Sequence, residues 1–309
     1  MCCLFGMIDY GHSLSRGQRT RLLTVLAAAC EARGTDAAGI AYHSRGQLYI
    51  NKRPGPAHKL RIRIPGDSWT VIGHTRMTTQ GSQAHNYNNH PFSGTTEKGP
   101  FALAHNGVIR NDLTLRKALR LPKTRIETDS YIAVQLLERE GSLTLDSLGN
   151  MAEQLEGSFT FTLLGPEGEF YLVKGDSPMC LYHYPRAGVY LYASTEEILL
   201  QALKQLQFPL GKPVRISTLC GEILKICADG KILRGQFDAS NLYAPWYPMR
   251  WYSYPTWGQL VRYPKPTSYL DEIKSVASAF GYSPEEIDRL AREGISPEEL
   301  EEFLYCGEL

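Results

Sequence analysis

The second residue of the chain combines two groups that can carry out nucleophilic chemistry. The sequence starts Met1-Cys2-Cys3-Leu4-Phe5-Gly6, and a cysteine directly after the initiator is small enough for Met1 to be removed. Cys2 would then hold a thiol with a pKa of about 8.5 beside a free α-amine with a pKa of about 7.7 to 8.0, so the amine is suited to accept the thiol proton. Because a cysteine at this position is also common in processed proteins without such chemistry, the interpretation depends on residues elsewhere in the chain.

Two predicted strands end in segments that carry polar groups. The runs 69–76 and 101–105 are apolar enough for buried strands, and each leads into a segment rich in turn-forming residues. His74 and His105 lie at these strand ends, and we expect them to act as hydrogen-bonding groups. Chemistry-bearing residues are therefore expected where the two strands end.

Strand-like and helix-like patterns alternate through the first 237 residues, which predicts an α+β architecture of sheets layered with helices. Further strands are expected over 2–10, 38–42, 158–164, 170–174, 181–184, 189–193 and 222–227, and helices over 15–33, 128–140, 143–155 and 195–206.

Composition and charge exclude several classes of protein. With 43% hydrophobic and 21% charged residues the chain is globular, and its longest apolar run, 22–30, is about half of a membrane span. The first twenty residues lack the pattern of a secretory signal, so a cytoplasmic protein is expected. Seven cysteines without a Cys-x-x-Cys pair indicate neither a disulfide scaffold nor a zinc site.

The composition changes after Phe237. Residues 243–266 are rich in aromatic residues and proline, which predicts a segment that packs on the catalytic body or exposes an aromatic surface to a partner. Three short helices are expected beyond it, two of them started by Ser283-Pro284-Glu285-Glu286 and Ser296-Pro297-Glu298-Glu299. Residues 268–309 carry eleven acidic and three basic residues, so this region and the rest of the chain have opposite net charge.

Several segments resemble, in order and spacing, the class II glutamine amidotransferases of the N-terminal nucleophile hydrolase superfamily. The start resembles the family's Met-Cys-Gly-Ile-x-Gly, and weaker similarities extend the resemblance to about residue 237. The four internal segments are Arg33-Gly34-Thr35-Asp36-Ala37-Ala38-Gly39, Gly73-His74-Thr75-Arg76-Met77-Thr78-Thr79-Gln80-Gly81, His105-Asn106-Gly107-Val108-Ile109-Arg110-Asn111 and Glu127-Thr128-Asp129-Ser130.

The resemblance implies a fold and a domain division. The fold is a four-layer αββα sandwich of two mainly antiparallel sheets, followed by a short helical C-terminal tail. Residues 1–237 would form the glutaminase domain, and residues 238–309 would hold the aromatic segment and the acidic helices.

The resemblance also assigns roles to individual residues. Cys2 is the nucleophile, and the Asn106 amide with the Gly107 N–H forms an oxyanion hole, although an Asn-Gly pair is also typical of a hairpin turn. Arg76, Thr79 and Asp129 bind glutamine, with the Arg76 fork on the α-carboxylate and Asp129 on the α-ammonium; the simpler alternative for these two is an ordinary ion pair each. Supporting positions are Arg33, Asp36 and His74. No metal or organic cofactor is required.

Three positions depart from the family's pattern. Cys3 stands where glycine is usual, which adds a second thiol beside the nucleophile. Met77 and Gln80 replace a tryptophan and a histidine, so closure over the substrate is in doubt more than the chemistry.

We expect an enzyme that releases ammonia from glutamine through a Cys2 thioester, with the ammonia passing to a separate synthase subunit. The expectation rests on the roughly 70 residues after the domain, which are too few for a fused synthase, and on the lack of a phosphate-binding glycine motif. Two alternatives are a γ-glutamyl amide hydrolase for a larger substrate and a catalytically silent regulatory or scaffold subunit. Nucleic-acid binding is not expected, because a solvated helix face explains the basic residues of 110–125. The sequence leaves the oligomeric state open.

Overall fold

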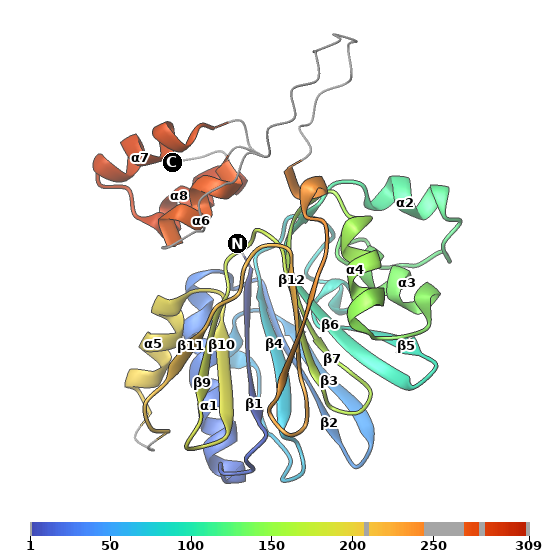
Figure 1. The fold of residues 1–309 in the computed structure, drawn as a ribbon, viewed down its shortest axis with the longest axis vertical. Helices are drawn as coiled ribbons and strands as arrows, with labels where there is room; N and C mark the ends of the chain where they lie inside the picture. Colours follow the sequence, from blue (N-terminus) through green and yellow to red (C-terminus); the bar gives the residue numbers. More distant parts are fainter. Residues whose placement is uncertain (1, 207–209, 244–268, 278–281, 307–309) are drawn as a thin grey trace. The chain divides into compact units, whose positions relative to one another are not determined.

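The computed structural model describes residues 2–206, 210–243, 269–277 and 282–306 (Figure 1). The chain divides into two compact units, Met1–Leu242 and Tyr243–Leu309. Leu242 packs in the same hydrophobic cluster as Phe237, so the first unit extends a few residues beyond the predicted boundary at 237. The assignment of residues 1–237 to a glutaminase domain stays a prediction.

Two antiparallel sheets form the centre of the first unit. The seven-stranded sheet has the order β11-β9-β10-β1-β4-β2-β3, and the six-stranded sheet has the order β13-β12-β8-β7-β6-β5. The strands of the first sheet are β1 (Cys3–Asp9), β2 (Ala37–Ser44), β3 (Gln47–Pro54), β4 (Thr70–Arg76), β9 (Cys180–Tyr184), β10 (Val189–Ala193) and β11 (Val214–Ile216). Those of the second are β5 (Phe92–Thr96), β6 (Gly99–Ile109), β7 (Gly157–Leu164), β8 (Phe170–Lys174), β12 (Glu222–Ile226) and β13 (Ile232–Gln236).

Helices cover the outer face of each sheet, which confirms the predicted four-layer sandwich (Figure 1). One outer layer holds α1 (Arg16–Ala29) and α5 (Glu196–Lys204); the other holds α2 (Asp112–Ala118), α3 (Tyr131–Glu140) and α4 (Leu145–Glu153). The first unit also contains short 3-10 helices, which lie between these elements at Cys30–Ala32, Ala57–Lys59 and Asn86–Asn88, and a further 3-10 helix at Ser240–Tyr243 marks the end of the unit.

Three hydrophobic clusters hold the layers together. The cluster between the sheets joins residues such as Leu4 and Ile72 of the first sheet to Ala104 and Leu172 of the second. The other two clusters lie between each sheet and its helices. Other layers pack on both faces of the central strands β1, β4, β6 and β7, so their side chains are almost all buried. Because this packing is dense, the ends of these strands are fixed with respect to one another.

Three local predictions were wrong. The strand expected over 101–105 continues to Ile109, so Asn106 and Gly107 lie inside β6, opposite Thr160 and Phe159 of β7, and do not form the hairpin turn of the alternative interpretation. The helix expected from residue 128 begins at Tyr131, which leaves 128–130 outside it. The basic residues of 110–125 do not share one helix face, because α2 ends at Ala118.

The second unit contains the three expected helices, α6 (Tyr269–Ala277), α7 (Pro284–Arg292) and α8 (Pro297–Cys306). Ser283 caps α7 by accepting a hydrogen bond from the Glu286 N–H at 3.2 Å, as its sequence predicts. Ile273, Ile287 and Leu300 form part of a small apolar core of this unit. The aromatic and proline-rich prediction for 243–266 falls, apart from Tyr243, outside the described residues.

Among the described helices, none is both long and apolar enough to cross a bilayer. Cys2, Cys3, Cys30 and Cys227 form no disulfide in the part of the chain that the structure describes, and Cys2 lies half-buried directly before β1.

Candidate active site

Cys2 lies at one end of the first sheet, where β1 starts and β4 ends. Cys3 pairs with Thr75 of β4, which brings Cys2 beside Arg76. The Cys2 sulfur lies 3.4 Å from the Met77 carbonyl oxygen, and Arg33 Nε donates to the Cys2 carbonyl oxygen at 3.0 Å. Cys2 is therefore held through its side chain by Met77 and through its backbone by Arg33.

Asp36 secures the chain just beyond Arg76. Its N–H donates to the Arg76 carbonyl oxygen at 2.9 Å, and its carboxylate accepts a hydrogen bond from the Thr78 N–H at 2.7 Å. Gly34 makes this approach possible, because a Cβ there would lie only 2.6 Å from the Arg76 carbonyl carbon. The segment 33–36 thus packs directly on the end of β4.

Arg76 is buried and its guanidinium faces the segment that follows β4. Nη1 donates to Asn89 Oδ1 at 2.8 Å, and Nη2 donates to the carbonyl oxygens of Gln80 and Gly81, the latter at 2.8 Å. Burial lowers the pKa of Arg76, while the nearby charges of Asp129 and Asp36 raise it. In the described structure neither Arg76 nor Asp129 makes a salt bridge within 4.0 Å, so the simpler ion-pair interpretation is wrong.

Asn106 and Gly107 come from the other sheet. Asn106 is buried, and within the described residues its amide nitrogen Nδ2 has no hydrogen-bond partner. Gly107 has a φ of +131°, and a Cβ there would lie 2.1 Å from the Ser158 carbonyl oxygen of β7. A buried amide donor without a protein partner is free to donate a hydrogen bond to a bound ligand.

Asp129 connects the end of β6 to the charges around Cys2. Its Oδ2 accepts a hydrogen bond from the Ile109 N–H at 2.7 Å, and its Oδ1 accepts one from the Ser130 hydroxyl at 3.3 Å. Burial raises the pKa of the Cys2 thiol; the positive charge of Arg76 lowers it and the negative charge of Asp129 raises it. Asp129 therefore contacts β6 while acting electrostatically on Cys2.

His74 joins the two sheets next to this site. Its Nε2 donates to the His105 carbonyl oxygen at 3.0 Å, and His105 Nδ1 lies 2.8 Å from the Ser130 hydroxyl. Burial, and secondarily the Arg76 charge, lowers the pKa of His74 to about 3, so its ring is neutral at physiological pH. Both histidines make hydrogen bonds, as predicted, but only His74 lies near a strand end, because β6 continues to Ile109 beyond His105.

Comparison with known proteins shows which family the chain is similar to. Residues 74–201 match the family model described as "Glutamine amidotransferase domain". The glutamine--fructose-6-phosphate aminotransferase [isomerizing] of Geobacillus kaustophilus is 32% identical over 234 residues, which cover 71% of this chain and 38% of that protein. The corresponding protein of Aquifex aeolicus is 36% identical over 141 residues, or 43% of this chain and 23% of that protein.

A solved structure shares the fold. The glutamine phosphoribosylpyrophosphate amidotransferase from B. subtilis superposes with a TM-score of 0.62 at 20% identity, covering 78% of this chain and 50% of that one. The chain carries a class II glutamine amidotransferase domain. It spans well under two-thirds of the length of the relatives it matches.

Thr79 is the predicted residue of this amidotransferase site with the weakest structural link. It lies in the segment between β4 and β5, is exposed, and its hydroxyl makes no hydrogen bond in the described structure. Its assignment to glutamine binding has no contact to support it.

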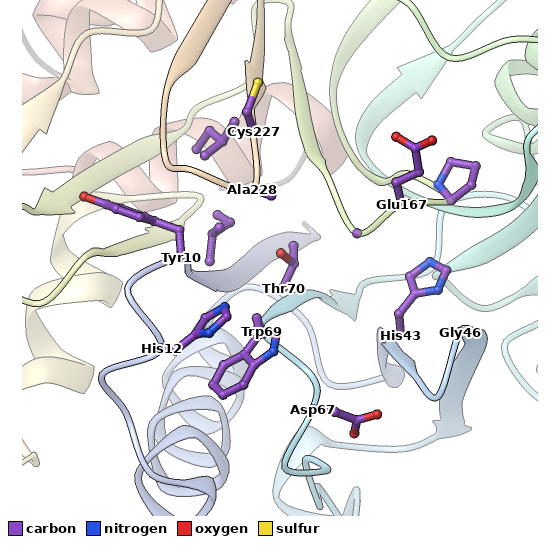
Figure 2. A pocket seen from close by; sticks show the side chains of 14 residues that line it. Tyr10, His12, His43, Gly46, Asp67, Trp69, Thr70, Glu167, Cys227 and Ala228 are labelled. Carbon is purple, nitrogen blue, oxygen red and sulfur yellow. The ribbon is translucent and has the colours of Figure 1, made fainter.

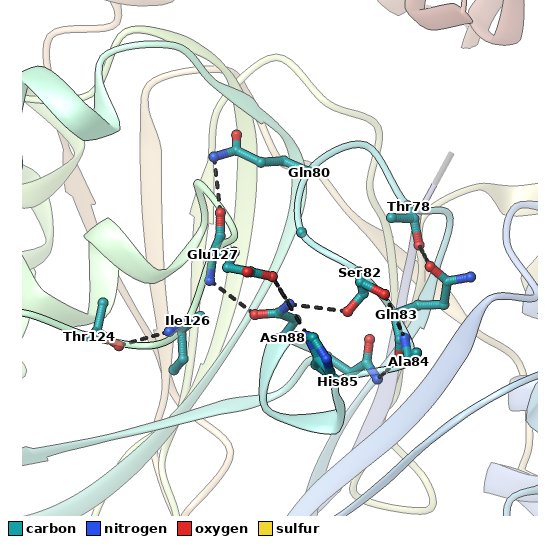
Figure 3. A network of polar contacts seen from close by, with 12 residues as sticks. Thr78, Gln80, Ser82, Gln83, Ala84, His85, Asn88, Thr124, Ile126 and Glu127 are labelled. Carbon is teal, nitrogen blue, oxygen red and sulfur yellow. Dashed lines mark hydrogen bonds and ion pairs between the residues drawn. The ribbon is translucent and has the colours of Figure 1, made fainter.

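The segment 77–89 also brings residues to the site that the sequence did not single out. Asn89 contacts Arg76, and Lys52 Nζ donates to the Asn89 and Pro91 carbonyl oxygens. Asn88 contacts Glu127, two residues before Asp129 (Figure 3). The paired asparagines before His90-Pro91 were the available signal, since two amides in a turn-rich segment commonly bond to neighbouring backbone.

A cavity of about 330 Å³ lies away from this site (Figure 2). Its lining includes Tyr10, His12 and Trp69, which lie beyond the last residue of β1 and before the first residue of β4. Because β1 spans seven residues, or roughly 23 Å, this cavity is at the opposite end of the sheet from Cys2. It is not part of the amidotransferase site.

Proposed function

We propose that the domain is a glutaminase that releases ammonia from glutamine through a covalent intermediate on Cys2. The observation that carries the proposal is the buried Asn106 amide on β6, which has no partner among the described residues and is followed directly by the N–H of Gly107. Two such donors suit the oxyanion that forms when a nucleophile attacks an amide, and removal of one donor typically costs about 3 to 4 kcal/mol of transition-state stabilisation.

The base in this mechanism is the α-amine of Cys2 after removal of Met1. Burial raises the pKa of the thiol, and in the described structure the sulfur's hydrogen-bond partner is the Met77 carbonyl, which cannot accept a proton from it as a base would. The amine takes the thiol proton, through a water, and returns it to the leaving nitrogen.

The chemistry then proceeds in two balanced steps. The Cys2 sulfur bonds to the side-chain carboxamide carbon (Cδ) of glutamine as the bond from that carbon to the amide nitrogen breaks, which gives a γ-glutamyl thioester and ammonia. Water, activated by the same amine, attacks the thioester and releases glutamate with the free thiol.

Arg76 and Asp129 select the amino acid head group. Three of the five guanidinium N–H groups are used in the contacts with Asn89, Gln80 and Gly81, which leaves Nε–H and one Nη1–H for an α-carboxylate. The buried Asp129 carboxylate supplies the counter-charge for the α-ammonium. The positions of Arg33, Asp36 and His74 hold these groups in place.

We further propose that the ammonia reaches an acceptor bound by a separate synthase. The proposal is supported by the names of the matched relatives, which state transfer to fructose 6-phosphate or phosphoribosylpyrophosphate. A cytoplasmic setting, like the partner itself, stays a prediction.

Product analysis of the untagged protein tests the proposal. Incubation with glutamine should give equal amounts of glutamate and ammonia, and Cys2→Ala should give neither while keeping its melting temperature within a few degrees. Preference for a bulkier γ-glutamyl amide by orders of magnitude in kcat/KM would instead establish a γ-glutamyl amide hydrolase. A correctly processed protein that hydrolyses none of these amides would refute the enzyme assignment.

A further inference from the structure

A buried asparagine ties the segment after β4 to the chain that leads to Asp129. Asn88 Nδ2 donates to Glu127 Oε2 at 2.7 Å and to the Ser82 carbonyl oxygen at 3.1 Å. Asn88 Oδ1 accepts a hydrogen bond from the Glu127 N–H at 3.0 Å. Gln80 Nε2 adds a bond to the Glu127 carbonyl oxygen at 3.0 Å, so Glu127 is held through its side chain, its N–H and its carbonyl (Figure 3).

Each end of this bridge adjoins a residue assigned to glutamine binding. On one side, Asn89 follows Asn88 directly and accepts from Arg76 Nη1, while the bridged Gln80 offers its carbonyl to Arg76 Nη2. On the other side, Glu127 precedes Asp129 by two residues. A shift of either end of the bridge would therefore change the separation of the Arg76 guanidinium and the Asp129 carboxylate.

We propose that Asn88 and Glu127 are positioning residues that set this separation, and with it the spacing at which the α-carboxylate and α-ammonium of glutamine are bound. The inference rests on the proposed glutaminase function. The pair specifies a substrate that carries both charged groups on one carbon, in preference to an amide that carries only one of them.

The chemistry of the bridge predicts which substitutions it tolerates. Glu127→Gln keeps an acceptor for Asn88 Nδ2, whereas Glu127→Ala removes it, so the first should stay within about threefold of the wild-type KM for glutamine. Asn88→Ala and Glu127→Ala should raise KM roughly 10- to 100-fold with little change in kcat, because misplacement on the order of 1 Å costs up to about 100-fold and head-group binding is made in the ground state.

A double substitution provides a rescue test. Asn88→Asp places a carboxylate against the Glu127 carboxylate and should raise KM at least as much as Asn88→Ala. Adding Glu127→Gln turns that repulsion into an amide-to-carboxylate hydrogen bond. The double variant should therefore bind glutamine more tightly than Asn88→Asp alone, since both variants lose the hydrogen bond to the Ser82 carbonyl equally.

Asp67→Ala is a matched control for loss of loop hydrogen bonds. Asp67 accepts from the Ser44 hydroxyl at 2.9 Å and from the Arg45 N–H at 2.7 Å, and it lies beside the cavity at the other end of the sheet. It should leave the glutamine KM unchanged even where it lowers the melting temperature.

The experiment measures kcat and KM for glutamine and for glutaric acid monoamide, which lacks the α-amine. The expected result is that the ratio of kcat/KM for glutamine to kcat/KM for the monoamide falls about tenfold or more in Asn88→Ala and Glu127→Ala. The ratio should be higher in the double variant Asn88→Asp/Glu127→Gln than in Asn88→Asp alone. Folded alanine variants with wild-type KM and ratio would overturn the positioning role while the glutaminase function stands. Should Asn88→Ala fail to fold, equal KM values for Asn88→Asp and the double variant would overturn it. A wild-type protein without glutaminase activity would overturn both proposals.

Discussion

Gly107→Ala tests whether the backbone of β6 forms part of the catalytic site. Gly107 has a φ of +131°, and an added Cβ would meet the Ser158 carbonyl oxygen at 2.1 Å, the Ser158 carbonyl carbon at 2.6 Å and the Phe159 Cα at 2.8 Å. All three are backbone atoms of the neighbouring strand, so no flexible side chain can move aside. Gly168→Ala is the matched control, because its φ of +86° is also positive but no atom lies within 4 Å of its Cβ.

The magnitude follows from these distances. Relief of the contact requires β6 and β7 to separate by roughly 1 Å, which displaces the Gly107 N–H and the Asn106 amide and should lower kcat about 100- to 1000-fold. Backbone strain at Gly107 should lower the free energy of unfolding by about 1 to 3 kcal/mol, before the disturbed strand pairing is counted. Gly168→Ala should cost about 1 to 2 kcal/mol and leave kcat unchanged.

Steady-state glutaminase kinetics and chemical denaturation of both variants provide the assay. A folded Gly107→Ala protein with wild-type kcat would refute the argument that this N–H acts on the transition state. A comparable kcat loss in Gly168→Ala would show that general destabilisation, not the oxyanion hole, is measured.

Two further predictions concern charge at the site. Asp129→Asn should raise the KM for glutamine at least tenfold with a smaller effect on kcat, because the proposed role of the carboxylate is to bind the α-ammonium in the ground state. Calorimetric titration of glutamine into the Cys2→Ala protein, with and without Asp129→Asn, would measure the same loss of affinity directly. Equal affinities of the two proteins would contradict the prediction. Burial lowers the pKa of His74 to about 3, below its unfolded value of about 6.5, so the unfolded chain binds the proton first and stability is lost as the pH falls below about 6.5. By pH 4 the wild-type protein should have lost about 3 kcal/mol more free energy of unfolding than His74→Asn. Urea denaturation of both proteins at several pH values measures this difference. If the free energy of unfolding falls with pH in parallel for the two proteins, His74 does not titrate in this way.

The sequence predicted the buried strands well and the edge strands poorly. β1 and β4 are continuous apolar runs in the middle of their sheet, and both appear within a residue or two of the predicted bounds. β3 and β13 were missed because each is an outer strand with a mostly polar or half-exposed face, as Asn51-Lys52-Arg53 in β3 illustrates. An edge strand buries too little surface to leave a clear apolar pattern.

The site shows the same division between local and non-local information. Cys2, Arg76 and Asn106 stand out by residue type and spacing. The sequence predicted that the strand ends at residue 105, however, because an Asn-Gly pair is typical of a turn, whereas β6 stays paired with β7 through Asn106 and Gly107. The bridge from Asn88 to Glu127 joins residues 39 apart, and no local pattern predicts such a contact.

The central claim is that Cys2, with its own amine, is the nucleophile. The most direct measurement is the intact mass of the untagged protein before and after treatment with an electrophilic glutamine analogue, followed by peptide mapping. We predict loss of Met1, one adduct on Cys2, protection by glutamine and no adduct in Cys2→Ala. An adduct on the neighbouring Cys3, or labelling of Cys2 in a chain that keeps Met1, would contradict the mechanism.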